Sequence, residues 1–214
     1  MGKLLLSLFL LLNYFICLSA DGTKAFEGRI NFLRETVYDT TYITIMVKGS
    51  MARIDEFDTQ KRLLSSQLVD FEKEKIIALS PSKKLYTSIP VLNSKVVSNN
   101  NYVIKKTQNF KEINGYKCYQ WRVRDPQHNT EAAYWVINEN FAFFDKLVAL
   151  INRTERSFAL YNLIPENEGY FPILTEERTL LRKEKLRIAV VDINEQNLHP
   201  SLFEVPRGYN PLRN

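Results

Sequence analysis

Residues 102–137 read YVIKKTQNFKEINGYKCYQWRVRDPQHNTEAAYWVI, and this stretch decides the fold. At its centre, Asn114 and Gly115 both accept a positive φ, which a two-residue type I′ hairpin turn requires. The flanking residues 102–113 and 116–123 are expected to be the two strands of that hairpin. A second turn at residues 125–129 leads to a third strand at 132–137. The stretch therefore predicts an antiparallel meander.

Apolar residues alternate with polar ones, or fall in short runs bounded by turns, through most of the remaining chain. This pattern indicates strands. It predicts them at residues 26–37, 42–47, 67–71, 76–79, 85–89, 171–181 and 185–193. The tail at 202–209 is expected to be a short edge segment, because Pro206 has no N–H to give to a central ladder.

One segment changes from the period of a strand to the period of a helix. Phe141, Phe144, Val148 and Ile151 are spaced by three, four and three residues, which places them on one helical face. Asn138 is a suitable N-cap. We expect the helix to run from there and to end before Pro165 at the latest.

These elements predict a mainly β protein of the α+β type. A large antiparallel sheet tends to curl, and its apolar face must be covered by another layer. We therefore expect an unclosed, half-barrel-like sheet with one main helix packed on its concave face. A curled sheet that holds a helix in its mouth is a natural pocket.

The first twenty residues have the organisation of a secretory signal peptide. Lys3 precedes an apolar block, and small residues then lead to a polar start at Asp21. We expect residues 1–20 to be removed and residues 21–214 to form a single exported domain, periplasmic or extracellular, without a transmembrane segment. The bulky Phe15 and Ile16 before Cys17 argue against lipoprotein anchoring through that cysteine.

Charge and cysteine content exclude some classes of function. Loss of Lys3 lowers the formal net charge from +5 to +4. The basic residues are scattered among acids, whereas a nucleic-acid binder concentrates them on one face. Only Cys118 remains after signal removal, so no internal disulfide can form and the fold must rest on its core.

Three segments carry a resemblance to a known family. They are Ile-Asn-Gly-Tyr-Lys-Cys at 113–118, Tyr-Trp-Val at 134–136 and Leu-Phe-Glu-Val-Pro-Arg-Gly-Tyr at 202–209. In this order they resemble a family of exported bacterial domains, domain of unknown function 4412. They are also similar to the wider group of periplasmic lipoprotein carriers and sensors typified by LolA, LolB and RseB. The resemblance implies an unclosed β-barrel that holds lipid acyl chains under helices, and it implies no catalytic residue.

The sequence contains no constellation typical of an enzyme, a metal site or a cofactor site. His128 and His199 lie in expected loops without a ligand partner at metal spacing. Neighbours in a strand point to opposite faces, so the pair Asp55 and Glu56 is expected to be solvated. We expect no catalytic residue, no metal and no cofactor.

Aromatic side chains gather at the helix and on the strands beside it. Ordinary core packing explains this, and part of the same surface could also line an apolar cavity with a helical lid. The candidate ligand-binding residues are Trp121, Trp135, Phe141, Phe144, Val148 and Ile151.

The sequence thus predicts a non-enzymatic exported binding module for an apolar or amphipathic, lipid-like ligand such as an acyl chain. The alternative is a protein-interaction or envelope-sensor module of the same fold without a small ligand. The first hypothesis requires a continuous apolar pocket, and the second requires a filled core with an apolar surface patch.

Overall fold

The computed structural model describes residues 25–91, 101–139, 141–151 and 156–212. Its strands form one twelve-stranded sheet in the order β12-β6-β5-β4-β3-β2-β1-β11-β10-β9-β8-β7. The strands are β1 (Gly28–Thr36), β2 (Thr40–Lys48), β3 (Met51–Phe57), β4 (Leu63–Asp70), β5 (Lys75–Ser80), β6 (Leu85–Ile89), β7 (Val103–Ile113), β8 (Tyr116–Asp125), β9 (Thr130–Asn138), β10 (Tyr170–Arg178), β11 (Glu184–Glu195) and β12 (Asn210–Pro211).

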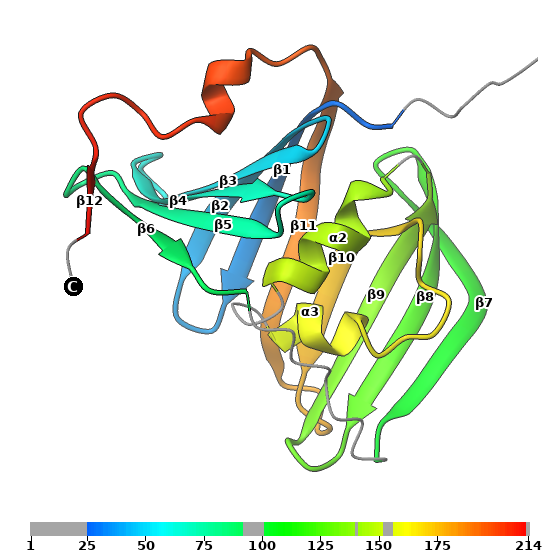
Figure 1. Cartoon of the computed structure of the whole chain (residues 1–214). Helices are drawn as coiled ribbons and strands as arrows, with labels where there is room; N and C mark the ends of the chain where they lie inside the picture. The colour runs from blue at the N-terminus through cyan, green and yellow to red at the C-terminus, as the bar shows by residue number, and fades with distance from the viewer. Residues whose placement is uncertain (1–24, 92–100, 140, 152–155, 213–214) are drawn as a thin grey trace, which may run out of the picture.

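The sheet is curled and unclosed, as the sequence predicts. Its two halves, β1–β6 and β7–β11, face each other around the helices α2 (Phe143–Ile151) and α3 (Arg156–Tyr161), as Figure 1 shows. They join where β1 pairs with β11. The predicted fold class is confirmed, with a second, shorter helix beside the expected one.

Alternation along the strands decides which side chains face the helices. On β1 the inward residues Ile30 and Phe32 are buried, and they lie opposite Ile45 and Ile43 of β2. Tyr134 of β9 also points inward, and its hydroxyl donates to the carbonyl of Ser157 in α3 at 2.5 Å. One contiguous apolar core therefore fills the space between the curled sheet and the helices.

The hairpin that anchors the sequence analysis is confirmed. Asn114 and Gly115 have φ values of 52° and 79°, and β7 and β8 pair on either side of them. The Asn114 side chain also donates to the carbonyl of Val190 at 2.8 Å, which ties this turn to β11.

Strand β3 was not predicted from the sequence, and the environment of Asp55 on this strand was predicted wrongly. Ala52 and Ile54 point inward, while Arg53 and Asp55 point to the convex face. The expectation that Asp55 is solvated is wrong. Its carboxylate is buried, accepts from Arg53 Nε at 2.8 Å and is hydrogen-bonded by Ser66. On the inner face of β3 only Ala52 and Ile54 are apolar before Glu56, so the alternation is too short to reveal the strand from the sequence.

The tail differs from the single edge segment that was expected. A 3₁₀ helix, η1 (Pro200–Phe203), lies against the convex face, where Leu198 and Phe203 pack with Met46. The chain then adds β12 in parallel to β6. Pro206 lies between these two elements, in neither of them.

The boundaries of the helical segment also differ. Asn138 is the last residue of β9, and α2 begins only at Phe143. In the part of the chain that is described, no helix combines the length and apolar character needed to cross a membrane.

Candidate functional site

Four of the six predicted site residues lie in the core between α2 and the sheet. Phe141, Phe144, Val148 and Ile151 are all buried. The Phe141 ring stacks on Phe171 of β10, with the ring centres 4.5 Å apart. These side chains hold the helix in place, and Ile151 also lines a cavity.

The two predicted tryptophans lie on opposite faces of the sheet. Trp121 points inward and packs on Tyr170, with ring centres 4.5 Å apart, and Lys106 Nζ lies 4.5 Å from the centre of the Trp121 ring. Trp135 follows the inward-pointing Tyr134 in β9, so it faces the convex side. There Lys111 Nζ lies 4.0 Å from its ring centre. Trp135 is therefore separated from the helices by the sheet.

A cavity of about 250 Å³ lies between the helices and strands β1 to β4. Its apolar wall combines isoleucines from two neighbouring strands with one side chain from each helix. These residues are Ile43, Ile45, Ile54, Ile151 and Phe158. The volume is slightly below the roughly 300–1,000 Å³ typical of small-molecule pockets.

Polar side chains complete the lining of this cavity. Arg34 comes from β1, Glu56 from β3, and Ser65 and Gln67 from β4. Glu56 and Ser65 are paired in register, and the Ser65 hydroxyl donates to Glu56 Oε2 at 3.2 Å. The cavity is thus amphipathic, with hydrogen-bonding groups on the sheet and an apolar roof under the helices.

The sequence carried a signal for this polar lining. Ser65 and Gln67 occupy the inward positions of β4, where Val69 further along is apolar and buried. A polar residue at an inward position is unusual. Gln67 fell within a predicted strand, but its facing could be assigned only once β3 was found.

Asp145 helps to fix the helical roof. Its Oδ2 accepts from the Gly169 N–H at 2.8 Å, and Oδ1 is buried without a hydrogen-bond partner. Burial raises the pKa of this carboxyl above its ordinary value, the Gly169 hydrogen bond opposes the rise, and Glu168 adds to it. The ionised form is therefore disfavoured in the folded protein.

Asp145→Asn is expected to stabilise the protein at neutral pH, by no more than about 1 kcal/mol. An amide keeps an acceptor for Gly169 and removes the buried charge. For a carboxyl with a raised folded-state pKa, the stability it contributes is full below its unfolded pKa, about 4, and is lost as pH rises through the folded pKa. The gain in unfolding free energy should therefore vanish in acid.

Asp70→Asn is the matched control for that titration. The N–H of Lys73 donates to Asp70 Oδ1 at 3.0 Å, and this bond, with the Lys73 charge, lowers the pKa of Asp70 against a smaller effect of burial. Its stabilisation is present at neutral pH and lost as pH falls through the folded pKa. The variant should therefore be less stable than wild type at pH 7. Equal pH profiles for the two variants would contradict the assignment.

The remaining reactive side chains do not come together. His128 Nδ1 lies 2.8 Å from Asp125 Oδ2 in the β8–β9 turn, whereas Cys118 lies near the other end of β8. His199 caps η1 and contacts Ser201. Cys118 is buried, and burial raises the pKa of its thiol. Over the described residues, no group of three histidine, cysteine or acidic side chains could hold a metal ion.

The fold and the cavity define an unclosed half-barrel whose helices roof an amphipathic pocket. Residues 26–209 match the family model described as Domain of unknown function (DUF4412). The chain therefore belongs to this family. No curated protein matches it.

Solved structures support the fold. An uncharacterized conserved protein from Thermus thermophilus is 6% identical, with a TM-score of 0.57, and the match covers 91% of this chain and 94% of that one. PNGF-II is 10% identical, with a TM-score of 0.46, over 86% of this chain and 30% of its own. An outer membrane lipoprotein-sorting protein domain from Vibrio parahaemolyticus is 8% identical, with a TM-score of 0.32, over 82% and 87%. The last two TM-scores are too low to carry an argument.

Proposed function

We propose that the protein is an exported, non-enzymatic binding module for an amphipathic, lipid-like ligand. The cavity under α2 and α3 carries this proposal, because it combines apolar side chains from the sheet and both helices with a polar patch on the sheet, formed by Arg34, Glu56, Ser65 and Gln67. An acyl chain would contact the isoleucines and Phe158, and its polar group would contact the patch. Binding would rest on burial of apolar surface, without a covalent step.

The shape of the cavity favours a roof that moves. Its roof consists of Ile151 at the end of α2 and Phe158 in α3, while its floor belongs to the sheet. Helices that rest on a sheet through side chains can shift further than strands held in a ladder. We therefore propose α2, which ends at Ile151, as the gate, and a place for the chain beside the LolA, LolB and RseB group.

The compartment belongs to the same proposal. The expected signal at residues 1–20 lies outside the described residues. We propose that the mature chain starts at about Asp21 and works outside the cytoplasm. Sequencing the N-terminus of protein taken from the exported fraction tests this directly.

Filling the cavity is expected to weaken ligand binding. In Ile54→Trp the larger side chain occupies the space between the helices and β3, and affinity for palmitate or phosphatidylglycerol should fall roughly tenfold or more. Native mass spectrometry of the exported protein measures the ligand-bound fraction, and organic extraction identifies what co-purifies.

Ile77→Trp is the control for that change. Ile77 pairs with Leu68 and points to the convex face of β5, away from the cavity. This variant should bind as wild type does. A wild-type protein that carries no lipid and takes up neither probe would overturn the lipid proposal and favour the protein-interaction alternative. Equal binding by Ile54→Trp would place the ligand elsewhere.

A further inference from the structure

Three turns lie side by side at one end of the half-barrel, where the halves of the sheet meet. Thr36 at the end of β1 pairs with Leu186 of β11, so the β1–β2 turn adjoins the β10–β11 turn. Arg178 pairs with Glu131, which brings the β8–β9 turn to the other side. Figure 1 shows all three at the lower end of the view. We call this surface, residues 36–39, 125–129 and 179–183, the turn end.

The β10–β11 turn holds Leu181 away from the protein, while Leu180 beside it is 37% exposed. The N–H of Thr179 donates to the carbonyl of Lys183 at 2.8 Å, and the N–H of Arg182 donates to the carbonyl of Thr179 at 2.8 Å. The Leu180 N–H donates to Asn129 Oδ1 at 3.1 Å, which fastens this turn to the next one. Leu181 at the tip is 89% exposed. A closed turn thus presents a leucine to solvent in a fixed position.

The β1–β2 turn is built in a similar way. Thr36 Oγ1 accepts from the N–H groups of Tyr38 at 3.2 Å and Asp39 at 3.0 Å. Tyr38 is 97% exposed and Val37 is 56% exposed. Ten large hydrophobic side chains are exposed in the described part of the chain, and half of them gather at or beside the turn end. They are Val37, Tyr38, Val103, Leu180 and Leu181.

Charged side chains of both signs lie at the turn end, and the basic ones are next to the leucines. Arg178 pairs with Glu176 at 2.9 Å, and Lys185 pairs with the buried Glu177 at 2.9 Å. Arg182 and Lys183, at the tip itself, have no ion-pair partner among the described residues. Two cations without partners thus stand next to the most exposed leucine of the turn.

This combination fits a membrane surface better than a protein partner. The cores of protein interfaces are depleted in lysine and are well packed, whereas these apolar side chains sit on separate turns with charges between them. Anionic headgroups attract lysine and arginine, apolar tips enter the headgroup boundary, and tyrosine favours that interface. We propose that the turn end docks on anionic lipid bilayers, with Leu181 and Tyr38 entering the interface.

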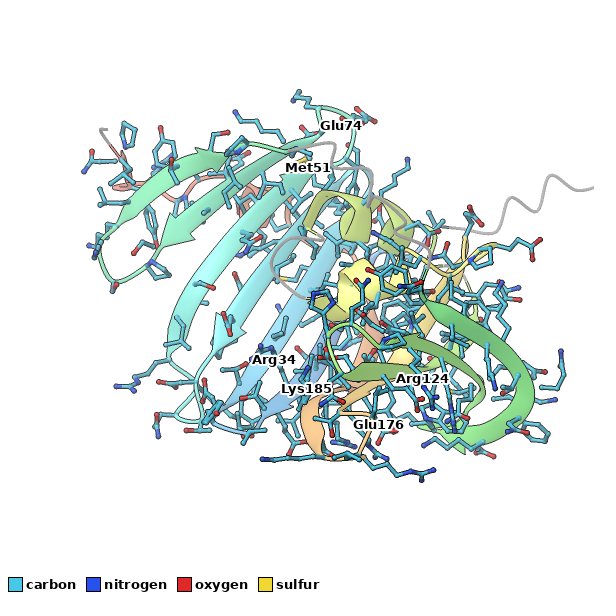
Figure 2. The ribbon with its side chains drawn as sticks, turned by 90° about the horizontal axis from the view of Figure 1, so that it is seen from below. Arg34, Met51, Glu74, Arg124, Glu176 and Lys185 are labelled. Atoms are coloured by element: carbon cyan, nitrogen blue, oxygen red, sulfur yellow. The ribbon has the colours of Figure 1, made fainter. Side chains whose placement is uncertain are left out.

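Docking at this end would also orient the cavity. Arg34, which lines the cavity, lies two residues before Thr36, and Figure 2 labels it near Lys185 at the same end. The polar residues Arg34 and Glu56 would then face the membrane. Docking itself goes beyond the proposed ligand binding and needs no ligand in the cavity.

Co-sedimentation of the full mature chain with vesicles tests the proposal. With equal parts of phosphatidylglycerol and phosphatidylcholine, wild type should bind, and it should bind less to phosphatidylcholine alone. Leu180→Ser with Leu181→Ser should weaken binding roughly tenfold. Arg182→Gln with Lys183→Gln should weaken it roughly thirtyfold, since each basic residue near such a surface contributes about 1 kcal/mol.

Two double variants at other surface positions are the controls, one for the loss of apolar side chains and one for the loss of positive charge. Val191 and Leu212 are also exposed, and Lys73 in the β4–β5 turn and Lys75 at the start of β5 lie at the opposite end of the sheet. Serine at the first pair or glutamine at the second should leave vesicle binding unchanged. Absence of wild-type binding, or equal losses in test and control pairs, would overturn the proposal. Ile54→Trp should still sediment with vesicles, so failure of the cavity proposal and failure of this one are distinguishable.

Discussion

Phe144→Ala is expected to destabilise the protein by about 3–5 kcal/mol, the range for removing a buried phenylalanine from a core. The side chain is 2% exposed. Its ring centre lies 5.0 Å from Phe171 of β10 and 5.7 Å from Tyr161 of α3. Alanine would leave a void where α2, α3 and the sheet meet. Since the free energy of unfolding of a whole domain is only about 5–15 kcal/mol, this one change would remove a large share of the stability of the protein.

Urea unfolding followed by circular dichroism measures the effect, and Phe110→Ala is its control. Phe110 is 61% exposed on the edge strand β7, so its loss should cost less than about 1 kcal/mol. If the two variants had similar urea midpoints of unfolding, Phe144 would not be a main contributor to the contact between the helices and the sheet. The same geometry shows that substitutions at Phe144 report on folding, whereas Ile54 tests the ligand site.

Gly28→Ala is expected to cost about 3 kcal/mol or more, although it adds a single methyl group. Gly28 has a φ of 155° and pairs with Val47 on one side and Glu195 on the other. A Cβ here would lie 2.2 Å from the Asn194 carbonyl oxygen and 2.9 Å from the Glu195 Cα. Both are backbone atoms, so no side chain can move aside and β11 itself would have to shift.

Gly115→Ala separates this clash from backbone strain. Gly115 has a φ of 79°, and a Cβ there would meet nothing within 4 Å. Only the strain of a left-handed residue remains, about 1–2 kcal/mol. Thermal unfolding of both variants gives the comparison. Equal losses would mean that conformation, and not contact with β11, makes glycine necessary at residue 28.

Strands with regular alternation and distinctive turns could be predicted from the sequence. The hairpin at Asn114 and Gly115 is specified by two adjacent residues, so its position needs no tertiary information. The helical stripe of Phe144, Val148 and Ile151 is specified by spacing alone, whereas Phe141, which was expected on the same helical face, precedes the start of α2. β3 could not be predicted because its charged residues leave few apolar ones, and Arg53 and Asp55 are satisfied by each other, by Ser66 of β4 and by the carbonyl of Leu202 far along the chain.

The candidate site was harder to predict than the fold, for a related reason. Four of the six residues predicted from the sequence are aromatic, and these four pack in the core or face the convex side, whereas the predicted Ile151 does line the cavity. Trp135 directly follows the inward-pointing Tyr134 in β9. Because neighbouring residues in a strand point to opposite faces, Trp135 lies on the convex face. The cavity itself lies where the curl of β1 to β4 separates the sheet from the helices, and that curl is a property of the whole sheet.

The pairing of β1 with β11 also determines the order in which this protein can fold. The Asn31 side chain meets Asp192 across 161 residues, and Glu35 meets Arg187 across 152. Contacts of such long range slow folding, because chain closure must precede them. Strand β11, which joins the two halves of the sheet by pairing with β1, is therefore missing until nearly all of the chain is present. The proposed export would require the chain to cross a membrane unfolded, and a late closing step would keep it unfolded for longer. The same delay gives its unpaired strands more time to aggregate.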